Sequence, residues 1–309
     1  MEQFKSGDRV CFVGDSITAQ NRYVALIVDH YKTNFPDQDI KIYNCGISGG
    51  RAALLHKYFD EDVLAHNPTH IIIMLGVNDS NFTSLGGRRT AERYELLEKY
   101  YEIYKTDFAQ LCQKAKSVGA KVTLLTPTPY AEYQDTSKEV LHKGAFALLA
   151  VYAEFVRNYA KENGFECIDV HSFITKQMQT KILFNDDCFH PNDLGHHCIA
   201  KSILQSQGLD IGEPKDFPEY LEKWRQAVIC YRGLYAVEYM VIPDNIDSVK
   251  EKIEFVKDYL ENKKYVNSYR AESVNLFFKK VSEEYVQNKL RQKEMFLEID
   301  KIYDETKIS

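Results

Sequence analysis

The sequence predicts an α/β protein built on a parallel sheet with helices on both faces. Five short apolar segments alternate with longer amphipathic segments, which is typical of strand–helix–strand crossover units. The third apolar segment, residues 70–76 (HIIIMLG), is almost continuously apolar, as expected for a central parallel strand covered on both faces. Ligands of such sheets bind beyond the carboxyl ends of the strands. We therefore expect the functional residues in the loops that follow the strands.

The other strands and the helices follow from the same apolar spacing. Short apolar runs predict four further strands, at residues 9–14, 40–44, 121–126 and 166–170. Apolar residues at helical spacing predict helices at residues 23–33, 52–65, 91–118 and 138–163, and a last helix that follows Pro191 and runs to about residue 205. Gly119 and Gly164 lie where two of these helices should end before the next strand begins.

The composition changes after about residue 206. Fourteen of the 15 glycines lie at or before Gly212, and a capping-box spacing of Ser248 and Glu251 opens a predicted helix. Apolar residues then recur at helical spacing, at Val249, Ile253, Val256 and Leu260. We therefore expect a catalytic domain over residues 1–206 and a helical extension over residues 207–309. The extension packs on the main domain, covers its cleft or joins two copies of the chain, and the sequence leaves these alternatives open.

The overall composition is that of a globular protein without a membrane span. Of the 309 residues, 44% are hydrophobic and 27% charged, and the net charge of -6 argues against nucleic acid as a partner. No stretch approaches the roughly 18 apolar residues that span a bilayer. The N-terminus has no secretory pattern, and the seven scattered cysteines include no C-x-x-C pair. We therefore expect a cytoplasmic protein with reduced thiols.

The first segment whose residues could take part in catalysis is Gly14-Asp15-Ser16, which follows the first predicted strand. A glycine and an acidic residue there permit a tight turn that presents the serine hydroxyl to solvent. Taken alone the pattern is weak, because a serine after an aspartate at a strand end is more often part of a turn or a helix cap.

The second segment is Asp187-Cys188-Phe189-His190, followed by Pro191. An aspartate three residues before a histidine can fold back so that its carboxylate accepts the imidazole N–H. The other ring nitrogen is then left to take a proton from a serine. Alone, this spacing also fits a simple turn at a helix entry.

Two loops offer donors for a developing oxyanion. Residues 44–50 (NCGISGG) follow the second strand, and their glycines let backbone N–H groups approach a ligand. Residues 76–79 (GVND) follow the third strand and place Asn78 where its amide can point inward. A preorganised donor of this kind is worth about 3 kcal/mol of activation barrier.

In combination, these four segments resemble the SGNH hydrolases, also called GDSL esterases and lipases. The family's four blocks appear in order as GDSIT (14–18), NCGISGG (44–50), GVND (76–79) and DDCFHP (186–191), and the resemblance spans roughly residues 8–205. It implies a three-layer α/β/α sandwich with a five-stranded parallel sheet of the flavodoxin-like kind. It also implies that no metal or organic cofactor is needed.

The resemblance assigns roles residue by residue. Ser16 is the expected nucleophile, His190 the general base and Asp187 the residue that orients His190, whereas Asp186 has the wrong spacing. The expected oxyanion hole consists of the Ser16 backbone N–H, the Gly49 backbone N–H and the Asn78 side chain. Gly46 matches the glycine of the second block less well than Gly49 does.

Several weaker candidates have equally good structural explanations. Asp15, Arg51 and Tyr130 are candidates for substrate contact, although a turn residue, a solvated arginine and a packed aromatic would look the same. His196 and His197, near the Asp187–His190 segment, resemble a metal cluster, but adjacent histidines on a helix point to different faces. We therefore predict no metal site.

The sequence thus predicts a serine ester hydrolase that acts through an acyl-serine intermediate. An acetyl or other short-chain ester of a carbohydrate or small molecule is the favoured substrate, because no long apolar loop near the four blocks could hold a fatty chain. A lysophospholipase or acyl-thioester hydrolase is the alternative enzyme. A non-catalytic binding module on the same fold is the alternative of another class, and a flavodoxin-like nucleotide binder is disfavoured because residues 14–21 (GDSITAQN) lack a phosphate-cradling pattern.

Overall fold

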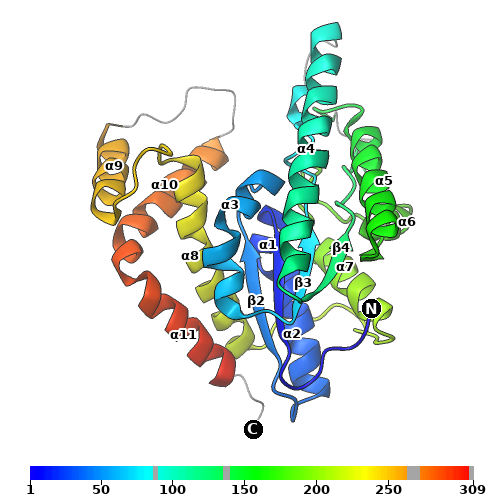
Figure 1. The fold of residues 1–309 in the computed structure, drawn as a ribbon, viewed down its shortest axis with the longest axis horizontal. Coiled ribbons are helices and arrows are strands. Elements are labelled where there is room, and N and C mark those ends of the chain that lie inside the picture. Colours follow the sequence, from blue (N-terminus) through cyan, green and yellow to red (C-terminus); the bar gives the residue numbers. More distant parts are fainter. Residues whose placement is uncertain (86–89, 135–139, 263–271, 306–309) are drawn as a thin grey trace. The chain divides into compact units, whose positions relative to one another are not determined.

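Figure 1 shows the fold in the computed structural model, which describes residues 1–85, 90–134, 140–262 and 272–305. The chain divides into two compact units. The first consists of Met1–Gly46 and Gly50–Asp216, and the second of Ile47–Gly49 and Phe217–Ser309.

The first unit contains the predicted parallel sheet, with five strands among the described residues in the order β2-β1-β3-β4-β5. The strands are β1 (Arg9–Gly14), β2 (Lys41–Gly46), β3 (His70–Met74), β4 (Lys121–Leu125) and β5 (Glu166–Ile168). Every neighbouring pair is parallel, and Gly14 at the end of β1 lies opposite Gly46 of β2 and Met74 of β3. The loops after β1, β2 and β3 therefore leave the sheet along one edge, where their side chains can meet.

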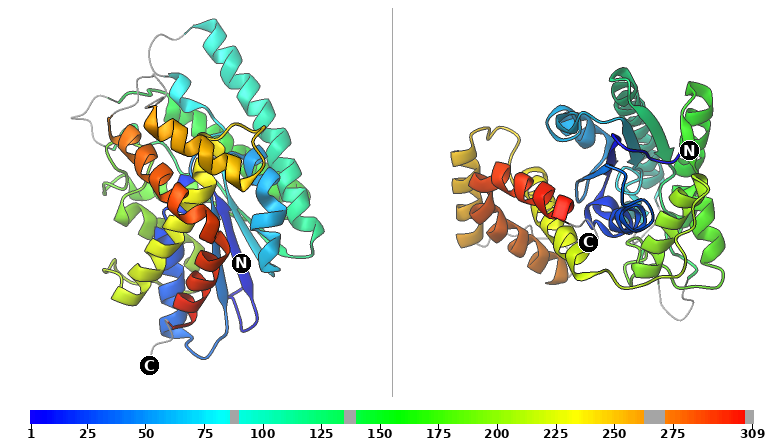
Figure 2. Two further views of the ribbon diagram at one scale, coloured as in Figure 1. Left: turned by 90° about the vertical axis from the view of Figure 1, so that its left-hand side faces the viewer. Right: turned by 90° about the horizontal axis from the view of Figure 1, so that it is seen from below.

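Helices cover both faces of this sheet, as the sequence predicts. They are α1 (Ser16–Ala19), α2 (Arg22–Asn34), α3 (Ala52–Asp62), α4 (Ala91–Ser117), α5 (Ala145–Asn163), α6 (Val170–Gln177) and α7 (Asp193–Ser206), with short 3-10 turns at Leu64–His66 and Phe82–Leu85. Helix α3 packs against α4 on one face and α2 against α7 on the other (Figure 2). The buried core lies between these layers and includes nearly the whole of β1 and β3.

Two helices differ from the sequence prediction. The helix expected from residue 138 begins at Ala145, because Gly144 before it adopts a φ of +93° that a continuous helix does not allow; residues 135–139 lie outside the described residues. Helix α6 was not predicted at all. The Asp169 carboxylate accepts a hydrogen bond from the backbone N–H of Ser172 at 3.1 Å and so caps this helix at its start.

The second unit is helical, as predicted. It consists of α8 (Glu219–Met240), α9 (Val249–Glu261), α10 (Glu272–Asn288) and α11 (Gln292–Glu305), with a 3-10 turn at Lys289–Arg291. Ser248 caps α9 by accepting a hydrogen bond from the backbone N–H of Glu251, which confirms the predicted start of this helix. Ile253 and Val256 of α9 join a buried cluster with Val237 of α8.

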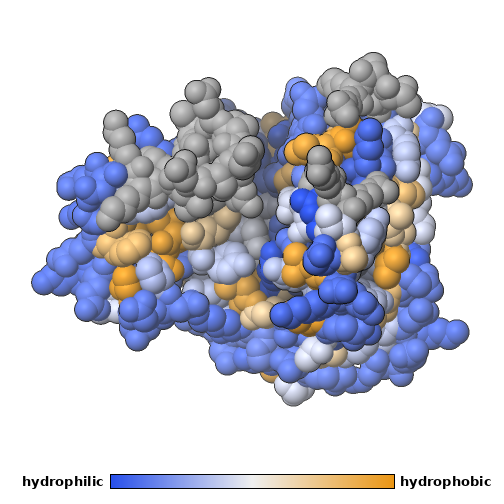
Figure 3. Space-filling view, turned by 90° about the horizontal axis from the view of Figure 1, so that it is seen from above, coloured by the Kyte–Doolittle hydropathy of each residue, from blue (hydrophilic) through white to orange (hydrophobic). Residues whose placement is uncertain are grey.

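Among the described residues, every helix is too short or too polar to cross a bilayer. The face seen in Figure 3 is mainly hydrophilic and carries smaller hydrophobic patches. Scattered exposed apolar residues of this kind are normal on a globular protein.

Candidate active site

Ser16 is the first residue of α1, directly after the end of β1. The buried Asp15 caps this short helix, because its carboxylate accepts a hydrogen bond from the Ile17 backbone N–H at 2.9 Å. A Cβ atom at Gly14 would stand 2.2 Å from the Thr18 Oγ1 atom, so only glycine lets α1 fold back this closely on the strand end. The sequence Gly-Asp-Ser thus fixes the position of the Ser16 hydroxyl.

The buried Asp15 carboxyl has a raised pKa of about 6. Loss of water on burial raises it, while the hydrogen bond from the Ile17 backbone N–H acts in the opposite direction. Asp15 is therefore a buried residue that holds the turn at Ser16 through its hydrogen bond with Ile17.

The Asp187–His190 segment forms a tight turn held by its own carboxylate. Asp187 Oδ1 accepts hydrogen bonds from the backbone N–H groups of Phe189 at 3.1 Å and His190 at 2.9 Å. Cys188 adopts a φ of +64°, which closes the turn, and its carbonyl accepts a hydrogen bond from the backbone N–H of Ala131 at 2.8 Å. The local spacing of the aspartate and the histidine therefore produces the geometry that the sequence predicts.

The structure brings Ser16, His190 and Asp187 into one hydrogen-bonded chain. Ser16 Oγ lies 2.8 Å from His190 Nε2, and His190 Nδ1 lies 2.7 Å from Asp187 Oδ2. Because a carboxylate oxygen only accepts, Nδ1 carries the proton and the Nε2 lone pair faces the serine hydroxyl. The pKa of Asp187 lies below its usual value. Partial burial alone would raise this pKa, but the hydrogen bonds from His190 lower it by more.

An aromatic cluster supports the imidazole from one side. The Phe189 and His190 ring centroids are 4.0 Å apart, and Phe189 in turn packs on Phe82 at 5.3 Å. Tyr130, a candidate substrate contact, lies in this cluster 5.3 Å from Phe82 and has only 1% of its surface exposed. Tyr130 therefore packs against Phe82, and its contact with substrate stays a prediction.

Asn78 and Asp79 tie the loop after β3 to the loop after β2. The Asn78 side-chain amide donates a hydrogen bond to the Gly50 carbonyl at 3.2 Å. The Asp79 carboxylate accepts a hydrogen bond from the Ala52 backbone N–H at 2.8 Å, at the first residue of α3. Asn78 is therefore held at the edge of the sheet where Ser16 lies.

Sequence reasoning missed the role of Asp79. Its carboxyl is buried, and burial raises its pKa to about 7, against the opposing effects of the Ala52 N–H and the Arg51 charge. The signal in the sequence was its position close behind a buried strand. A carboxylate buried there needs a hydrogen-bond donor from another part of the chain.

The remaining predicted residues lie in or beside the loop after β2. Gly49 has a φ of +75°, and Ile47–Gly49 group with the second unit, so the role of Gly49 stays a prediction. The Arg51 guanidinium lies 5.3 Å from the centre of the Tyr100 ring. A Cβ at Gly46 would stand 2.4 Å from the Ala19 backbone nitrogen, so this glycine serves the packing of α1 on β2.

The two adjacent histidines of α7 point to different surroundings. His196 Nε2 lies 2.9 Å from Gln20 Oε1, whereas His197 lines a separate pocket. Across the described part of the chain, no group of three or more histidine, cysteine, aspartate or glutamate side chains is arranged to hold a metal ion.

Sequence comparison places this fold among known relatives. The model of the GDSL-like lipase/acylhydrolase family matches residues 12–198. An acetylxylan esterase of Geobacillus stearothermophilus is 26% identical over 229 residues, which cover 66% of this chain and 96% of that protein. The uncharacterized protein YpmR of Bacillus subtilis (strain 168) is 22% identical over 213 residues, covering 64% of this chain and 80% of YpmR.

Solved structures share the fold. A gut microbial diltiazem-metabolizing enzyme has a TM-score of 0.78 and 18% identity, with 98% of this chain and 96% of that chain covered. A variant of the Geobacillus stearothermophilus acetyl xylan esterase has a TM-score of 0.56 and 24% identity, with 68% and 99% covered. Because the family model spans more than half of the chain and the α/β fold agrees with it, the chain belongs to the GDSL-like lipase/acylhydrolase family.

Proposed function

We propose that this ester hydrolase uses Ser16 as its nucleophile, His190 as general base and Asp187 to orient His190. One observation carries the proposal: the continuous hydrogen-bonded chain from Asp187 Oδ2 through both ring nitrogens of His190 to Ser16 Oγ, with steps of 2.7 and 2.8 Å. A serine hydroxyl is a weak nucleophile until a neighbouring base accepts its proton.

In the first step, Ser16 Oγ attacks the ester carbonyl carbon while its proton passes to His190 Nε2. Asp187, ionised because its pKa is lowered, stabilises the resulting imidazolium and keeps Nδ1 protonated. The carbonyl oxygen becomes an oxyanion, which we expect to accept hydrogen bonds from the backbone N–H groups of Ser16 and Gly49 and from Asn78. An amide nitrogen carries two hydrogens, so Asn78 can serve the Gly50 carbonyl and the oxyanion together.

Collapse of the tetrahedral intermediate breaks the ester C–O bond. The leaving alcohol takes the proton from His190 Nε2, and the acyl group stays on Ser16. A water molecule then attacks the acyl-serine while His190 accepts one of its protons. Release of the acid returns that proton to Ser16 Oγ, so the cycle consumes one water and needs no other reactant.

The proposed substrate is an acetyl or other short-chain ester of a carbohydrate or small molecule. The support comes from the acetylxylan esterase relative, which is similar over almost its whole length. Solved catalytic mutants of that enzyme replace a serine, an aspartate and a histidine, the last two spaced three positions apart as Asp187 and His190 are here.

The test is hydrolysis of p-nitrophenyl esters from acetate to palmitate, together with acetate release from acetylated xylo-oligosaccharides. We expect the highest kcat/KM on acetate, release of acetate from the oligosaccharide, and loss of both in Ser16→Ala. A maximum of kcat/KM at long acyl chains would instead favour lipid or thioester substrates. Full activity of Ser16→Ala would reject the nucleophile.

A further inference from the structure

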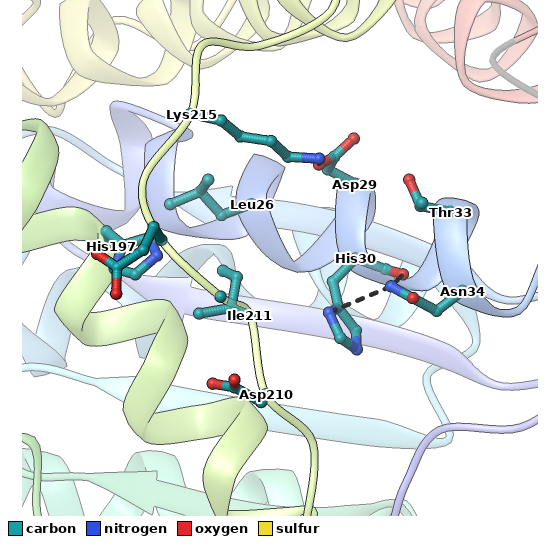
Figure 4. Close-up of a pocket in the computed structure, with 11 residues that line it drawn as sticks. Leu26, Asp29, His30, Thr33, Asn34, His197, Asp210, Ile211 and Lys215 are labelled. Atoms are coloured by element: carbon teal, nitrogen blue, oxygen red, sulfur yellow. Dashed lines mark hydrogen bonds and ion pairs between the residues drawn. The ribbon is translucent and has the colours of Figure 1, made fainter.

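A second polar site lies in the first unit, between α2, α7 and residues 210–215 (Figure 4). Its volume is about 340 Å³, within the range of small-molecule sites. Its lining includes Leu26, Asp29 and His30 of α2 and His197 of α7. Ser16, Asp187 and His190 are not among the residues that line this pocket.

Three polar side chains that line the pocket are buried, and each has an atom without a hydrogen-bond partner. Asp29, His30 and His197 have 4%, 9% and 5% of their surface exposed. Within the described residues, Asp29 Oδ1, His30 Nε2 and His197 Nε2 have no hydrogen-bond partner. Since buried polar atoms in proteins are nearly always paired, three such atoms around one pocket indicate a partner molecule that the chain does not itself supply.

The charges of the pocket favour a cation. The described lining residues carry three carboxylates, Asp29, Asp210 and Glu213, against the single ammonium of Lys215. Lys201, outside the lining, approaches Asp210 only to 3.9 Å. Burial lowers the pKa of both His30 and His197, so the two rings add no positive charge near neutral pH.

Lys215 shows which group fits Asp29. Its ammonium lies 2.9 Å from Asp29 Oδ2, although the Lys215 side chain is 59% exposed, and the side chain extends from its loop to Asp29 of α2 (Figure 4). An ion pair made by an exposed lysine contributes little free energy, because its ammonium is well solvated when the pair breaks. A ligand ammonium can therefore replace Lys215 on the Asp29 carboxylate.

The histidines define the rest of the ligand. The Asn34 side-chain amide donates to His30 Nδ1 at 3.4 Å, so Nε2 carries the ring proton and requires an acceptor. A hydroxyl group both donates and accepts, and therefore suits His30 Nε2 and either tautomer of His197. The apolar side chains of Leu26 and Ile211 can contact the carbon skeleton between these groups.

We propose that this pocket binds a small hydroxyl-bearing primary ammonium compound of about the size of an amino sugar. Its ammonium replaces Lys215 on Asp29, and its hydroxyls pair with His30 and His197. The site is independent of the roles proposed for Ser16, Asp187 and His190, because none of these residues lines it.

The test is calorimetric titration of the full chain at pH 6.5 with D-glucosamine, D-glucose and D-glucuronate, which offer an ammonium, a hydroxyl and a carboxylate on related rings. We expect saturable binding of glucosamine, at least about tenfold weaker binding of glucose, and none of glucuronate. Glucosamine should not compete with p-nitrophenyl acetate for hydrolysis. Absence of saturable glucosamine binding, equal affinity for the three sugars, or competitive inhibition would overturn the proposal.

Two variants locate the site, and both should keep the wild-type esterase activity. Asp29→Asn should lose the preference for glucosamine over glucose. Lys215→Met should bind glucosamine several-fold more tightly because the competing ammonium is gone, whereas Lys223→Met, at an exposed lysine of α8, should bind it as the wild type does. Unchanged or weaker binding by Lys215→Met contradicts the proposal, and this exposed position keeps the test valid if Asp29→Asn fails to fold.

Discussion

The Asp79 carboxylate accepts a hydrogen bond from the Ala52 backbone N–H at 2.8 Å and so joins the end of β3 to the start of α3. The two residues are 27 positions apart in the chain. This one contact sets where the loop after β2 ends, and Asn78, the neighbour of Asp79, binds the Gly50 carbonyl of the same loop. Asp79 is thus a positioning residue beneath the proposed oxyanion hole.

Asp79 should make stability depend on pH. Burial raises its pKa from 3.8 to about 7, so between these values the folded state holds a proton that the unfolded state releases. The free energy of unfolding should therefore fall as the pH rises from about 4 to about 7, by roughly 1.4 kcal/mol per unit of pKa difference. Asp79→Asn keeps an acceptor for Ala52 and removes this dependence.

The measurement is urea unfolding of the wild type and Asp79→Asn from pH 4 to 8. The variant should gain stability relative to the wild type as the pH rises to about 7, and the difference should then stay constant. Parallel curves across this range would show that the Asp79 pKa is not raised by folding.

Asp187 and Asp186 provide a matched pair of substitutions. Asp187→Asn should lower kcat by about 10³–10⁴-fold, because an amide cannot hold the His190 tautomer and does not stabilise the imidazolium. Asp186→Asn should stay near the wild-type value, since it is the Asp187 carboxylate that accepts the hydrogen bond from His190 Nδ1. Steady-state kinetics on p-nitrophenyl acetate distinguish the two, and a similar loss in both variants would reject the assignment.

Phe189 should control the orientation of His190. Its ring centroid lies 4.0 Å from that of His190, so Phe189→Ala removes one wall of the imidazole. We expect kcat to fall by up to about tenfold with a smaller change in KM, and Phe189→Leu to recover part of the loss. A change in KM alone would assign Phe189 to substrate binding instead.

Substitution by alanine should change the stability of the protein in opposite directions at two glycines. At Gly14 the new Cβ would stand 2.2 Å from Thr18 Oγ1, so Gly14→Ala should destabilise the first unit by about 1–3 kcal/mol and reduce activity. At Gly233, inside α8, the nearest atom is Val281 Cγ1 at 3.9 Å, so Gly233→Ala should stabilise by about 0.5–1 kcal/mol. Thermal unfolding of both variants tests this; a stable, active Gly14→Ala would mean that α1 does not need the close approach.

Features with a local signal were predictable from the sequence. The run His70–Met74 is a buried strand because each residue is covered on both faces of the sheet, which leaves an unbroken apolar segment. The Asp187–His190 pair was predictable because the four residues of one turn contain the whole interaction. The parallel sheet was predictable from the regular alternation of strands and helices.

Features that depend on distant residues were not predictable. The cap that Asp79 places on α3 and the approach of Asp29, His30 and His197 arise only when separate elements pack together. The start of α5 was missed because apolar spacing continues before Gly144, where the backbone leaves the helical region. Helix α6 was missed because its eight residues are too few for a clear periodic pattern.

During turnover the acyl group should pass through Ser16, and trapping the acyl-enzyme intermediate shows whether it does. Rapid acid quench of a turnover with p-nitrophenyl acetate, followed by peptide mass spectrometry, should find an acetyl group on the peptide that contains Ser16. Ser16→Ala should show neither this adduct nor a burst of p-nitrophenol. A burst with the acetyl group on another residue, or unimpaired turnover by Ser16→Ala, would contradict the account.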